Sequence, residues 1–415
     1  MKFFINSYFV DNQSIGLLSH IKKRLPYGMD DQWMVFSHYT ERGWTVDNLW
    51  HIFTDFYGGQ YAPLAFLSYL VLYAGFGYDP FYFHMFSLLL HIGCVCLVWK
   101  LISSLLRVHG GVSEKQILYV NFITTLLFAV HPINVEAVAW ISALKVLLYA
   151  FFYLLGLLCY LRYIRTSKIF YYVLTIGCFL CSFWGKEQAV TFPLALLIVD
   201  WFTNRNMKNL EVWSEKMSFL IMAFFFGIIT VLSQGKGPYE MIFPLYQRLL
   251  FGCFALVEYI TKSLLPVNLN FFYPFPIVLG EEPPLHYYLY PVVLLFLMGW
   301  IIAYRNNRYL VFGVLLFLVN LLFSIHLFNM SRHAIVADRY MYLSYVGIAF
   351  LIANGIWWLR KRLSYFKAAL VFLFFYCFFL SVYTFHYTKK WENTTMVKKY
   401  TKEVLEKRLN GSNHL

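Results

Sequence analysis

The feature that most restricts how this chain can fold is its series of long, unbroken apolar runs. Examples are Ala150–Tyr160, Met217–Leu232 and Ala368–Tyr383, and further apolar residues extend each of them. One helix needs about 20 mostly apolar residues to cross a bilayer. Continuous runs without two-residue alternation predict helices and argue against a membrane barrel. With 60% apolar and 13% charged residues, the chain is predicted to be an all-α, polytopic membrane protein.

The basic loops between these runs predict the orientation of the helices. Lys and Arg gather in the loop after every second apolar run, which is typical of the cytoplasmic face of a membrane protein. The net charge of +13 therefore indicates membrane orientation and not a nucleic-acid partner. The predicted spans lie near residues 81–104, 116–130, 146–163, 169–184, 189–202, 217–233, 285–303, 309–326, 341–358 and 366–386.

One further apolar segment, Leu249–Leu265, does not fit this alternation. A full crossing there would invert every later loop, so a re-entrant or interfacial helix is predicted, and the total is about 10–11 membrane helices. Three regions follow: an N-terminal segment and first external loop (1–80), a transmembrane domain (81–386) and a short, polar, basic tail (387–415). The membrane is expected to be a bacterial inner membrane or the endoplasmic reticulum.

Every polar cluster that could carry chemistry falls on the predicted non-cytoplasmic face, which was assigned from Lys and Arg alone. Ionisable groups at a membrane face are costly unless hydrated or paired, so they indicate a functional site. The first cluster is Asp30-Asp31. Adjacent carboxylates can supply a general base, hold a divalent cation, or simply form a solvated turn.

The second and third clusters lie at breaks between predicted helices. Pro132 ends one helix, and Glu136 falls in the first turn of the next, where its charge suits the helix dipole. His131 is either a cap or a ligand-facing side chain. In the turn 185–188, Lys186 and Glu187 are either a neutralised ion pair or, for the lysine, a phosphate contact.

The fourth cluster is Asp338-Arg339-Tyr340, at the start of another predicted span. Arg339 could bind a phosphate through both arms of its guanidinium, with Asp338 or Tyr340 fixing its orientation. The alternative for Tyr340 is simple anchoring at the membrane interface.

Taken in order, these motifs resemble a known family. The segments are DD, YAPLAFLSYLVLYAGFGYDPFYFHMFSLLLH, HPINVEAVAWIS, GKEQAVTFPLALLIVD, RLLFGCFALVEYITKSLLPVNLNFFYPFP and ADRYMYLSYVGI. They closely resemble the membrane half of the transmembrane and tetratricopeptide-repeat O-mannosyltransferase-like family, within the GT-C superfamily of glycosyltransferases. The resemblance runs from about Asp30 to Trp391 and keeps both order and spacing.

This resemblance implies a GT-C-type helical bundle with a site open to the lumen or periplasm. It implies transfer of mannose or another hexose from a polyisoprenyl-phosphate-linked donor to a protein or glycan hydroxyl. No cofactor is required, and a divalent cation is compatible with the paired carboxylates. The implied roles are catalytic base for Asp30 or Asp31, donor-phosphate binding for Lys186, Arg339 and Lys145, and lining of the site for His131, Glu136, Glu187, Asp338 and Tyr340.

The chain departs from the family pattern at three places, which leaves one alternative open, and a cavity with cations would suit a second. Leu144-Lys145-Val146 stands where Arg-Lys-Asp is usual, no span is readable just before Asp30, and no repeats are expected after Trp391. One alternative is an inactive relative that binds the lipid donor or a partner. The other is a transporter or flippase of a polyprenyl-linked molecule, although no repeated halves are visible and the polar groups gather at one face.

Overall fold

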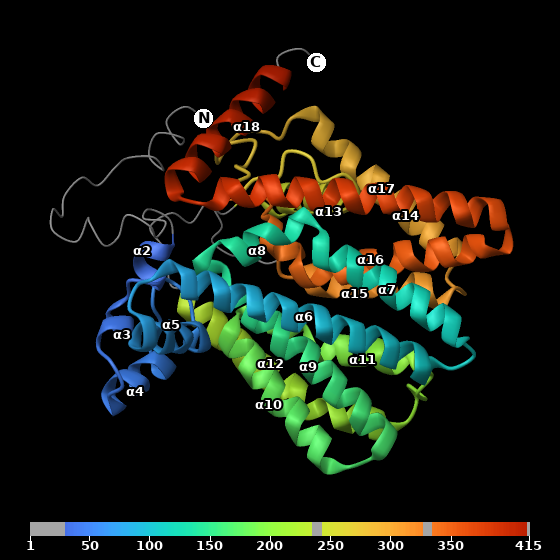
Figure 1. Cartoon of the computed structure of the whole chain (residues 1–415), viewed down its shortest axis with the longest axis horizontal. Helices are drawn as coiled ribbons and strands as arrows, with labels where there is room; N and C mark the ends of the chain where they lie inside the picture. The colour runs from blue at the N-terminus through green and yellow to red at the C-terminus, as the bar shows by residue number, and fades with distance from the viewer. Residues whose placement is uncertain (1–29, 235–242, 327–333, 413–415) are drawn as a thin grey trace.

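The computed structural model of the protein describes residues 30–234, 243–326 and 334–412. Within these residues it is helical, with two isolated β-bridges and no strand (Figure 1). The all-α, polytopic class predicted from the sequence is confirmed. The helices are α2 (Asp31–Met34), α3 (His38–Glu41), α4 (Val46–Thr54), α5 (Pro63–Phe76), α6 (Pro80–His109), α7 (Glu114–Val130), α8 (Val135–Ala139), α9 (Leu144–Thr166), α10 (Ile169–Gly185), α11 (Phe192–Phe202), α12 (Leu210–Gln234), α13 (Leu245–Leu264), α14 (Leu289–Ala303), α15 (Arg308–Leu321), α16 (Met341–Trp358), α17 (Leu363–Thr388) and α18 (Thr394–Ser412).

Local sequence explains several helix boundaries. The side chain of Asp79 accepts a hydrogen bond from the backbone N–H of Phe81, and Pro80 occupies the first helical position of α6. That helix ends at Gly110, whose φ of +77° suits glycine. Ser113 then caps α7 by accepting from the backbone of Gln116. The two helices can therefore reverse direction within four residues.

Helices occur at all ten predicted span positions, but they differ in length. Six are long and apolar enough to cross a membrane, and a seventh is obtained if α7 and the segment Pro132–Ala139, bent by 51°, count as one span. Helices α5, α10 and α15 are apolar but shorter. The predicted span 189–202 is corrected: its α-helix, α11, covers only Phe192–Phe202 and follows a 3₁₀ turn. Part of the expected 10–11 crossings is thus made by shorter or broken helices.

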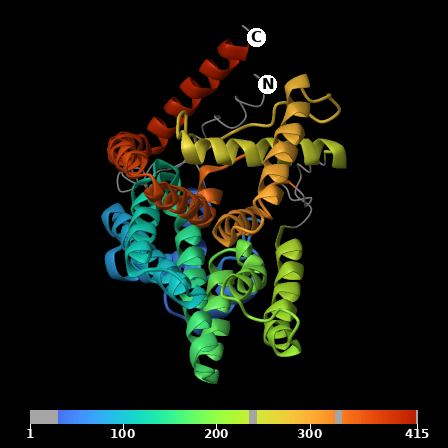
Figure 2. The ribbon, with the colours of Figure 1, turned by 90° about the vertical axis from the view of Figure 1, so that its right-hand side faces the viewer.

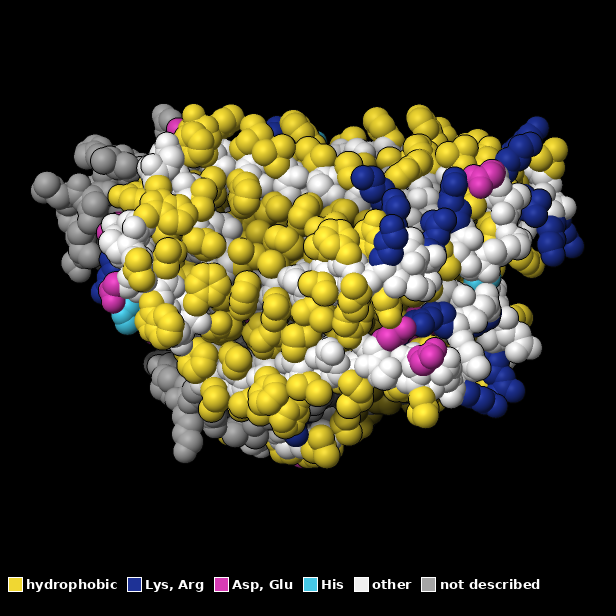
Figure 3. Space-filling view, turned by 90° about the horizontal axis from the view of Figure 1, so that it is seen from below, with side chains coloured by type: hydrophobic (Ala, Val, Ile, Leu, Met, Phe, Trp, Pro, Cys, Tyr) yellow, Lys and Arg dark blue, Asp and Glu magenta, His cyan; other side chains and the backbone are white. Residues whose placement is uncertain are grey.

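The two ends of the bundle differ in charge. Helices α2–α5, α8 and α18 lie at one end of the long axis, which we call the external end (Figure 1). The opposite end carries exposed Arg107 and Arg165, in the last turns of α6 and α9, and exposed Arg305, in the loop after α14. Seen from below, Lys and Arg gather toward that end, beside a broad apolar band (Figure 3). This arrangement agrees with the orientation predicted from the basic loops.

Lys216 is a basic residue that does not belong to a loop at the charged end of the bundle. It lies inside α12 with a fully buried side chain and pairs with Asp200 of α11 and with Glu215, 3.0 Å away. Arg205 joins the same group, 2.6 Å from Glu215 and 3.1 Å from Asp200. The hydroxyl of Tyr160 donates to Asp200 at 2.9 Å. Two cations and two carboxylates cancel, so α9, α11 and α12 meet here without net buried charge.

Helix α13 contains most of the segment predicted to be re-entrant or interfacial. It is 20 residues long but does not meet the criteria for a membrane-crossing helix. In Figure 2 it lies across the view, whereas α16 and α17 point toward the viewer. Its last turns reach the external end, where the hydroxyl of Tyr259 accepts from the backbone of Ala337. Helix α13 therefore crosses the bundle instead of running along it.

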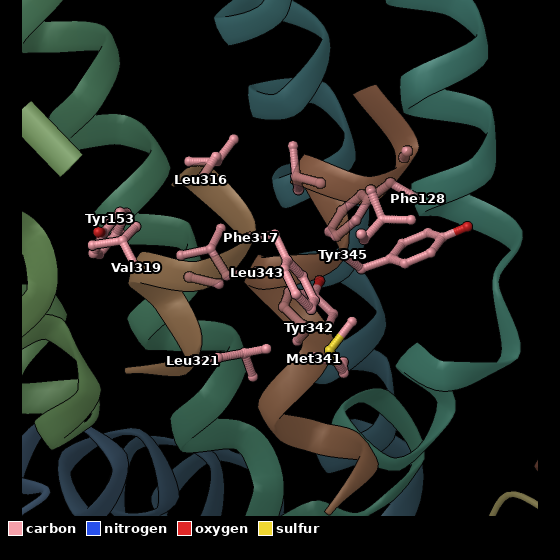
Figure 4. Packing of buried hydrophobic residues seen from close by; sticks show 14 of the residues in the cluster. Phe128, Tyr153, Leu316, Phe317, Val319, Leu321, Met341, Tyr342, Leu343 and Tyr345 are labelled. Atoms are coloured by element: carbon pink, nitrogen blue, oxygen red, sulfur yellow. The ribbon is translucent and has the colours of Figure 1, made fainter. Parts of the chain in front are cut away.

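Helices α15 and α16 pack closely against each other in the apolar core. Phe317 of α15 lies beside Leu343 of α16, whereas the ring of Tyr345 points to the side away from α15 (Figure 4). A methyl group added at Gly347 would lie 2.5 Å from the carbonyl oxygen of Gly313 and 2.7 Å from the backbone nitrogen of Phe317. Both neighbours are backbone atoms, so they cannot move aside without separating the helices.

Replacement of Gly347 by Ala should therefore lower the free energy of unfolding by about 1–3 kcal/mol. The thermal midpoint and the yield of the purified protein should fall as a result. Gly355→Ala is the matched control, because it lies in the same helix and no atom lies within 4 Å of its added methyl group. That change should be neutral or slightly stabilising, since Ala is a better helix former. Equal midpoints for the two variants in detergent would contradict the tight contact.

Candidate active site at the external end of the bundle

The Asp30-Asp31 turn is fastened to the loop between α8 and α9. The Asp31 side chain is 1% exposed and accepts three hydrogen bonds. The donors are the backbone N–H of Ser142 at 2.9 Å, the indole N–H of Trp140 at 3.2 Å and the hydroxyl of Ser142. A buried carboxylate is tolerated only with such partners. Residues more than 100 positions apart in sequence are thereby brought together.

Burial raises the pKa of Asp31 to about 7, from an ordinary value of 3.8. The hydrogen bonds from Ser142 and Trp140 oppose this rise, and the neighbouring charge of Asp30 adds to it. Asp31 thus changes charge near neutral pH. Because its pKa is higher in the folded protein, its contribution to stability is full below about pH 4 and is lost as the pH rises to about 7.

This linkage gives a pH-dependent prediction. As the pH rises from 4.5 to 8, the free energy of unfolding of the wild type should fall relative to that of Asp31→Asn, by up to about 4 kcal/mol. The thermal midpoint of the wild type should fall with it. Scans in detergent at several pH values measure the difference. Asp47→Asn, at a largely exposed position of α4, is the control and should follow the wild type. A constant difference between wild type and Asp31→Asn across this range would contradict the raised pKa.

Asp30 has a different environment from its neighbour. It is only half-buried, and none of the described residues donates a hydrogen bond to its carboxylate. Its charge acts on Lys145 and on Arg339, so it faces the same region as both cations. Of the two carboxylates that the sequence left as alternatives for the base, Asp30 is the accessible one and Asp31 is the anchored one.

Arg339 is paired with Glu136. The carboxylate of Glu136 is completely buried and accepts from both the guanidinium and, at 2.6 Å, the backbone N–H of Arg339. The side chain of Arg339 remains 20% exposed. The sequence placed these residues in separate motifs, 203 positions apart. Their contact joins α8 to the 3₁₀ turn at the start of α16.

Aromatic rings link this pair to the other cations. The guanidinium of Arg339 lies 5.3 Å from the ring of Trp140 and 5.2 Å from that of Tyr340. The ammonium of Lys186 lies 4.8 Å from the same Tyr340 ring. Cations above aromatic faces gain electrostatic stabilisation that does not cancel their charge. Tyr340 thus holds two of the predicted phosphate-binding residues near each other, on different elements.

Lys145 is the third cation of the site. It is buried in the first turn of α9, and its ammonium donates to the side-chain oxygen of Gln60 at 2.6 Å. The sulfur of Met34, in α2, lies 3.6 Å away. The charges of Asp30, Glu187 and Arg339 all act on Lys145. The half-buried Glu187 belongs to the 3₁₀ turn that follows Lys186.

Asp338 does not orient Arg339, which corrects one of the two expectations for that residue. Its carboxylate is completely buried and accepts from the hydroxyl of Tyr273 at 2.8 Å and from the backbone N–H of Asn270 at 3.2 Å. Glu136, Trp140 and Tyr340 orient Arg339 instead. Asp338 fastens the irregular loop after α13 to the start of α16.

His131 lies in the geometry of a helix cap. It is buried, and its Nδ1 accepts from the backbone N–H of Ile133 at 3.2 Å. Its ring lies 4.2 Å from that of Tyr345. Of the two readings open in the sequence, this geometry is that of the cap. His131 supports the turn that carries Glu136, which is the residue that reaches Arg339.

The residues that sequence reasoning missed are Trp140, Ser142 and Gln60. Trp140 and Ser142 belong to the HPINVEAVAWIS segment, in which only His131 and Glu136 received roles. A tryptophan and a serine in a predicted loop next to charged motifs were the available signal, because both carry donors that a buried carboxylate needs. Nothing in the sequence around Gln60 pointed to Lys145.

No group of three or more His, Cys, Asp or Glu side chains suited to a metal ion occurs in residues 30–234, 243–326 and 334–412. The polar residues at the external end instead form a continuous series. It runs from Asp30 and Asp31 through Trp140 to Arg339, and from there through Tyr340 to Lys186. A carboxylate that can accept a proton therefore lies in the same region as cations that can stabilise a departing anion.

Comparisons with known proteins agree with the resemblance seen in the motifs. The chain is 32% identical over 189 residues to protein O-mannosyl-transferase TMTC2 of Mus musculus and 33% identical over 189 residues to that of Homo sapiens; each match covers 41% of this chain and 21% of the relative. Protein O-mannosyl-transferase Tmtc3 of Drosophila melanogaster is 28% identical over 172 residues, which cover 37% of this chain and 18% of the relative.

The matched segment thus spans about a fifth of the length of these curated relatives. No family model matches the chain, and neither does any solved structure. Relatives named TMTC1 and TMTC4 match with similar identity. Over about 40% of its length the chain is therefore similar to proteins named protein O-mannosyl-transferases, and the family resemblance predicted from its motifs is confirmed.

Proposed function

We propose that the chain is a membrane glycosyltransferase that transfers mannose from a polyisoprenyl-phosphate-linked donor to a hydroxyl group of a protein. The supporting observation is that Asp30, Lys145, Lys186 and Arg339 gather at the external end of the bundle although they come from four elements. The names of the curated relatives support the class of reaction. The site would open to the lumen or the periplasm.

In this reaction Asp30 accepts the proton of the acceptor hydroxyl, and the hydroxyl oxygen bonds to C1 of the mannose. The bond between C1 and the phosphate oxygen breaks, and its electron pair stays on that oxygen. A phosphate leaving group needs no proton donor, but it needs positive charge. Lys186 and Lys145 supply that charge as point cations, and Arg339 supplies the part of its guanidinium that Glu136 does not occupy.

Lipid is expected at the site because the donor carries a polyisoprenyl chain. Many large hydrophobic side chains of α14 and α17 are exposed and form an apolar surface. Six helices of the described residues are long and apolar enough to cross a membrane, and in a bilayer this surface would face the acyl chains. The lipid tail of the donor can therefore stay in the bilayer while its phosphate reaches the cations.

The test is reconstitution of the purified chain in lipid nanodiscs with polyisoprenyl-phosphate mannose labelled with tritium in the sugar. The acceptor is an unfolded protein rich in Ser and Thr. Labelled protein, together with an equal amount of released polyisoprenyl phosphate, is the expected product. Addition of a chelator or of Mg²⁺ checks whether a divalent cation takes part.

Two outcomes would replace this proposal. Movement of the intact donor between the leaflets of a proteoliposome, without transfer, would assign a transporter. Donor binding without transfer to any hydroxyl acceptor would assign an inactive relative. The departure at Leu144 and Val146 from the family pattern makes the second outcome informative, because the chain keeps Lys145 but not the flanking charges of that pattern.

A further inference from the structure

Trp140 contacts both a carboxylate and a cation of the site. The edge of its indole donates a hydrogen bond to Oδ2 of Asp31 at 3.2 Å, and the face of its ring lies 5.3 Å from the guanidinium of Arg339. The side chain is 5% exposed, so neither contact is a chance surface encounter. One rigid ring thus fixes the distance between the turn that carries Asp30 and the segment that carries Arg339.

The ring of Trp140 is itself held from the C-terminal side. Trp391, at the end of the last membrane helix, packs against it with ring centroids 6.2 Å apart. Leu269 and Val397 belong to the same buried cluster. Thr401 of α18 donates to the side-chain oxygen of Asn270 at 2.7 Å, and the backbone of Asn270 donates to Asp338, next to Arg339. The tail therefore supports the site from behind.

We propose that Trp140 is a positioning residue of the transfer reaction, which sets Asp30 and Arg339 at the distance that the donor and the acceptor require. This inference rests on the proposed function. Trp140 acts through its neighbours: its N–H acts on the anchor Asp31, and its ring acts on the cation Arg339. The two contacts use different parts of the side chain, so different substitutions can separate them.

Trp140→Phe removes the N–H but keeps an aromatic face. The loss of a hydrogen bond to a charged group should lower kcat about tenfold through a loosened Asp30-Asp31 turn. The KM for polyisoprenyl-phosphate mannose should stay unchanged, because the ring still faces Arg339. Trp140→Leu removes both contacts and should raise that KM several-fold as well. If Trp140 had a purely structural role, Trp140→Phe would not lower kcat while leaving KM unchanged.

A second readout does not depend on activity. The hydrogen bond from Trp140 lowers the pKa of Asp31, so its removal should move the titration of Asp31 to higher pH, by about one unit. Infrared spectroscopy follows the carboxyl band that Asp31→Asn abolishes. The other titratable groups that interact with Asp31 are Asp30 and Tyr69 of α5. Lys145 of α9 and Arg339 interact with the neighbouring Asp30. None of these groups is altered.

Trp213→Phe is the matched control. Trp213 lies in α12, outside this site, and its indole donates to the carbonyl of Met207, in the preceding loop, at 2.9 Å. Its replacement also removes an indole hydrogen bond, but it should change neither kcat nor the titration. If Trp140→Leu does not accumulate as folded protein, Trp140→Met replaces it.

An unchanged kcat and an unchanged Asp31 titration in Trp140→Phe would overturn the role of the N–H. Equal donor KM in Trp140→Phe and Trp140→Leu would overturn the role of the ring. An inactive wild type would instead refute the proposed function, and the infrared titration would still decide whether Trp140 holds Asp31.

Discussion

Replacement of Asp30 by Asn should reduce mannose transfer by at least about 100-fold while the protein still accumulates and binds its donor. A positioned general base contributes on the order of 10²–10⁴ in rate, and amide oxygen is a very weak base. Asp30 is half-buried, and none of the described residues depends on its side chain for a hydrogen bond. The fold should therefore tolerate an amide of the same shape. Initial rates of labelled-protein formation in nanodiscs measure the effect.

Two further variants make this result specific. Asp47→Asn, at the exposed start of α4, should transfer at the wild-type rate. Asp31→Asn should lose less activity than Asp30→Asn, since Asp31 holds the turn and is not the accessible group. The reverse order would assign the base to Asp31. Full activity in Asp30→Asn, in Asp31→Asn and in the double variant would remove the pair from the chemistry altogether.

Breaking the pair of Glu136 and Arg339 is expected to give the largest loss of stability. Arg339→Gln leaves a completely buried carboxylate without its cation, which should cost about 3–5 kcal/mol. The double variant Glu136→Gln with Arg339→Gln removes both charges and should recover most of that stability. It should not recover donor binding, because the cation is still missing. Thermal midpoints and yields of the wild type, of the single variants Glu136→Gln and Arg339→Gln and of the double variant form a double-mutant cycle.

Arg339→Lys separates the two roles of the residue, which are the ion pair with Glu136 and the binding of the donor phosphate. It keeps the positive charge beside Glu136, so the fold should survive, but it loses the planar fork that lies near Trp140 and Tyr340. Affinity for polyisoprenyl-phosphate mannose should fall about tenfold or more. Lys186→Gln should weaken binding in the same assay. Unchanged donor affinity in both variants would exclude these residues from the phosphate site.

The comparison of sequence and structure is clearest at these charged residues. In the sequence, Arg339 follows Asp338 and Lys186 precedes Glu187, so local ion pairs were the natural alternative. In the structure Arg339 pairs with Glu136, and Asp338 with Tyr273. Side chains of consecutive residues at a helix start point in different directions. Adjacency in sequence is thus a poor guide to pairing once helices from distant parts of the chain pack together.

The sequence by itself determined the helices, and it predicted that the polar clusters share one face. Apolar runs in lipid must satisfy their backbone internally, so the helices at the ten predicted positions needed no tertiary information. Only the tertiary structure decided which polar groups meet. Asp31 reaches Ser142, Glu136 reaches Arg339, and Lys216 is buried against Asp200. Each pairing depends on where helices cross, and that is set by the packing of side chains far apart in the chain.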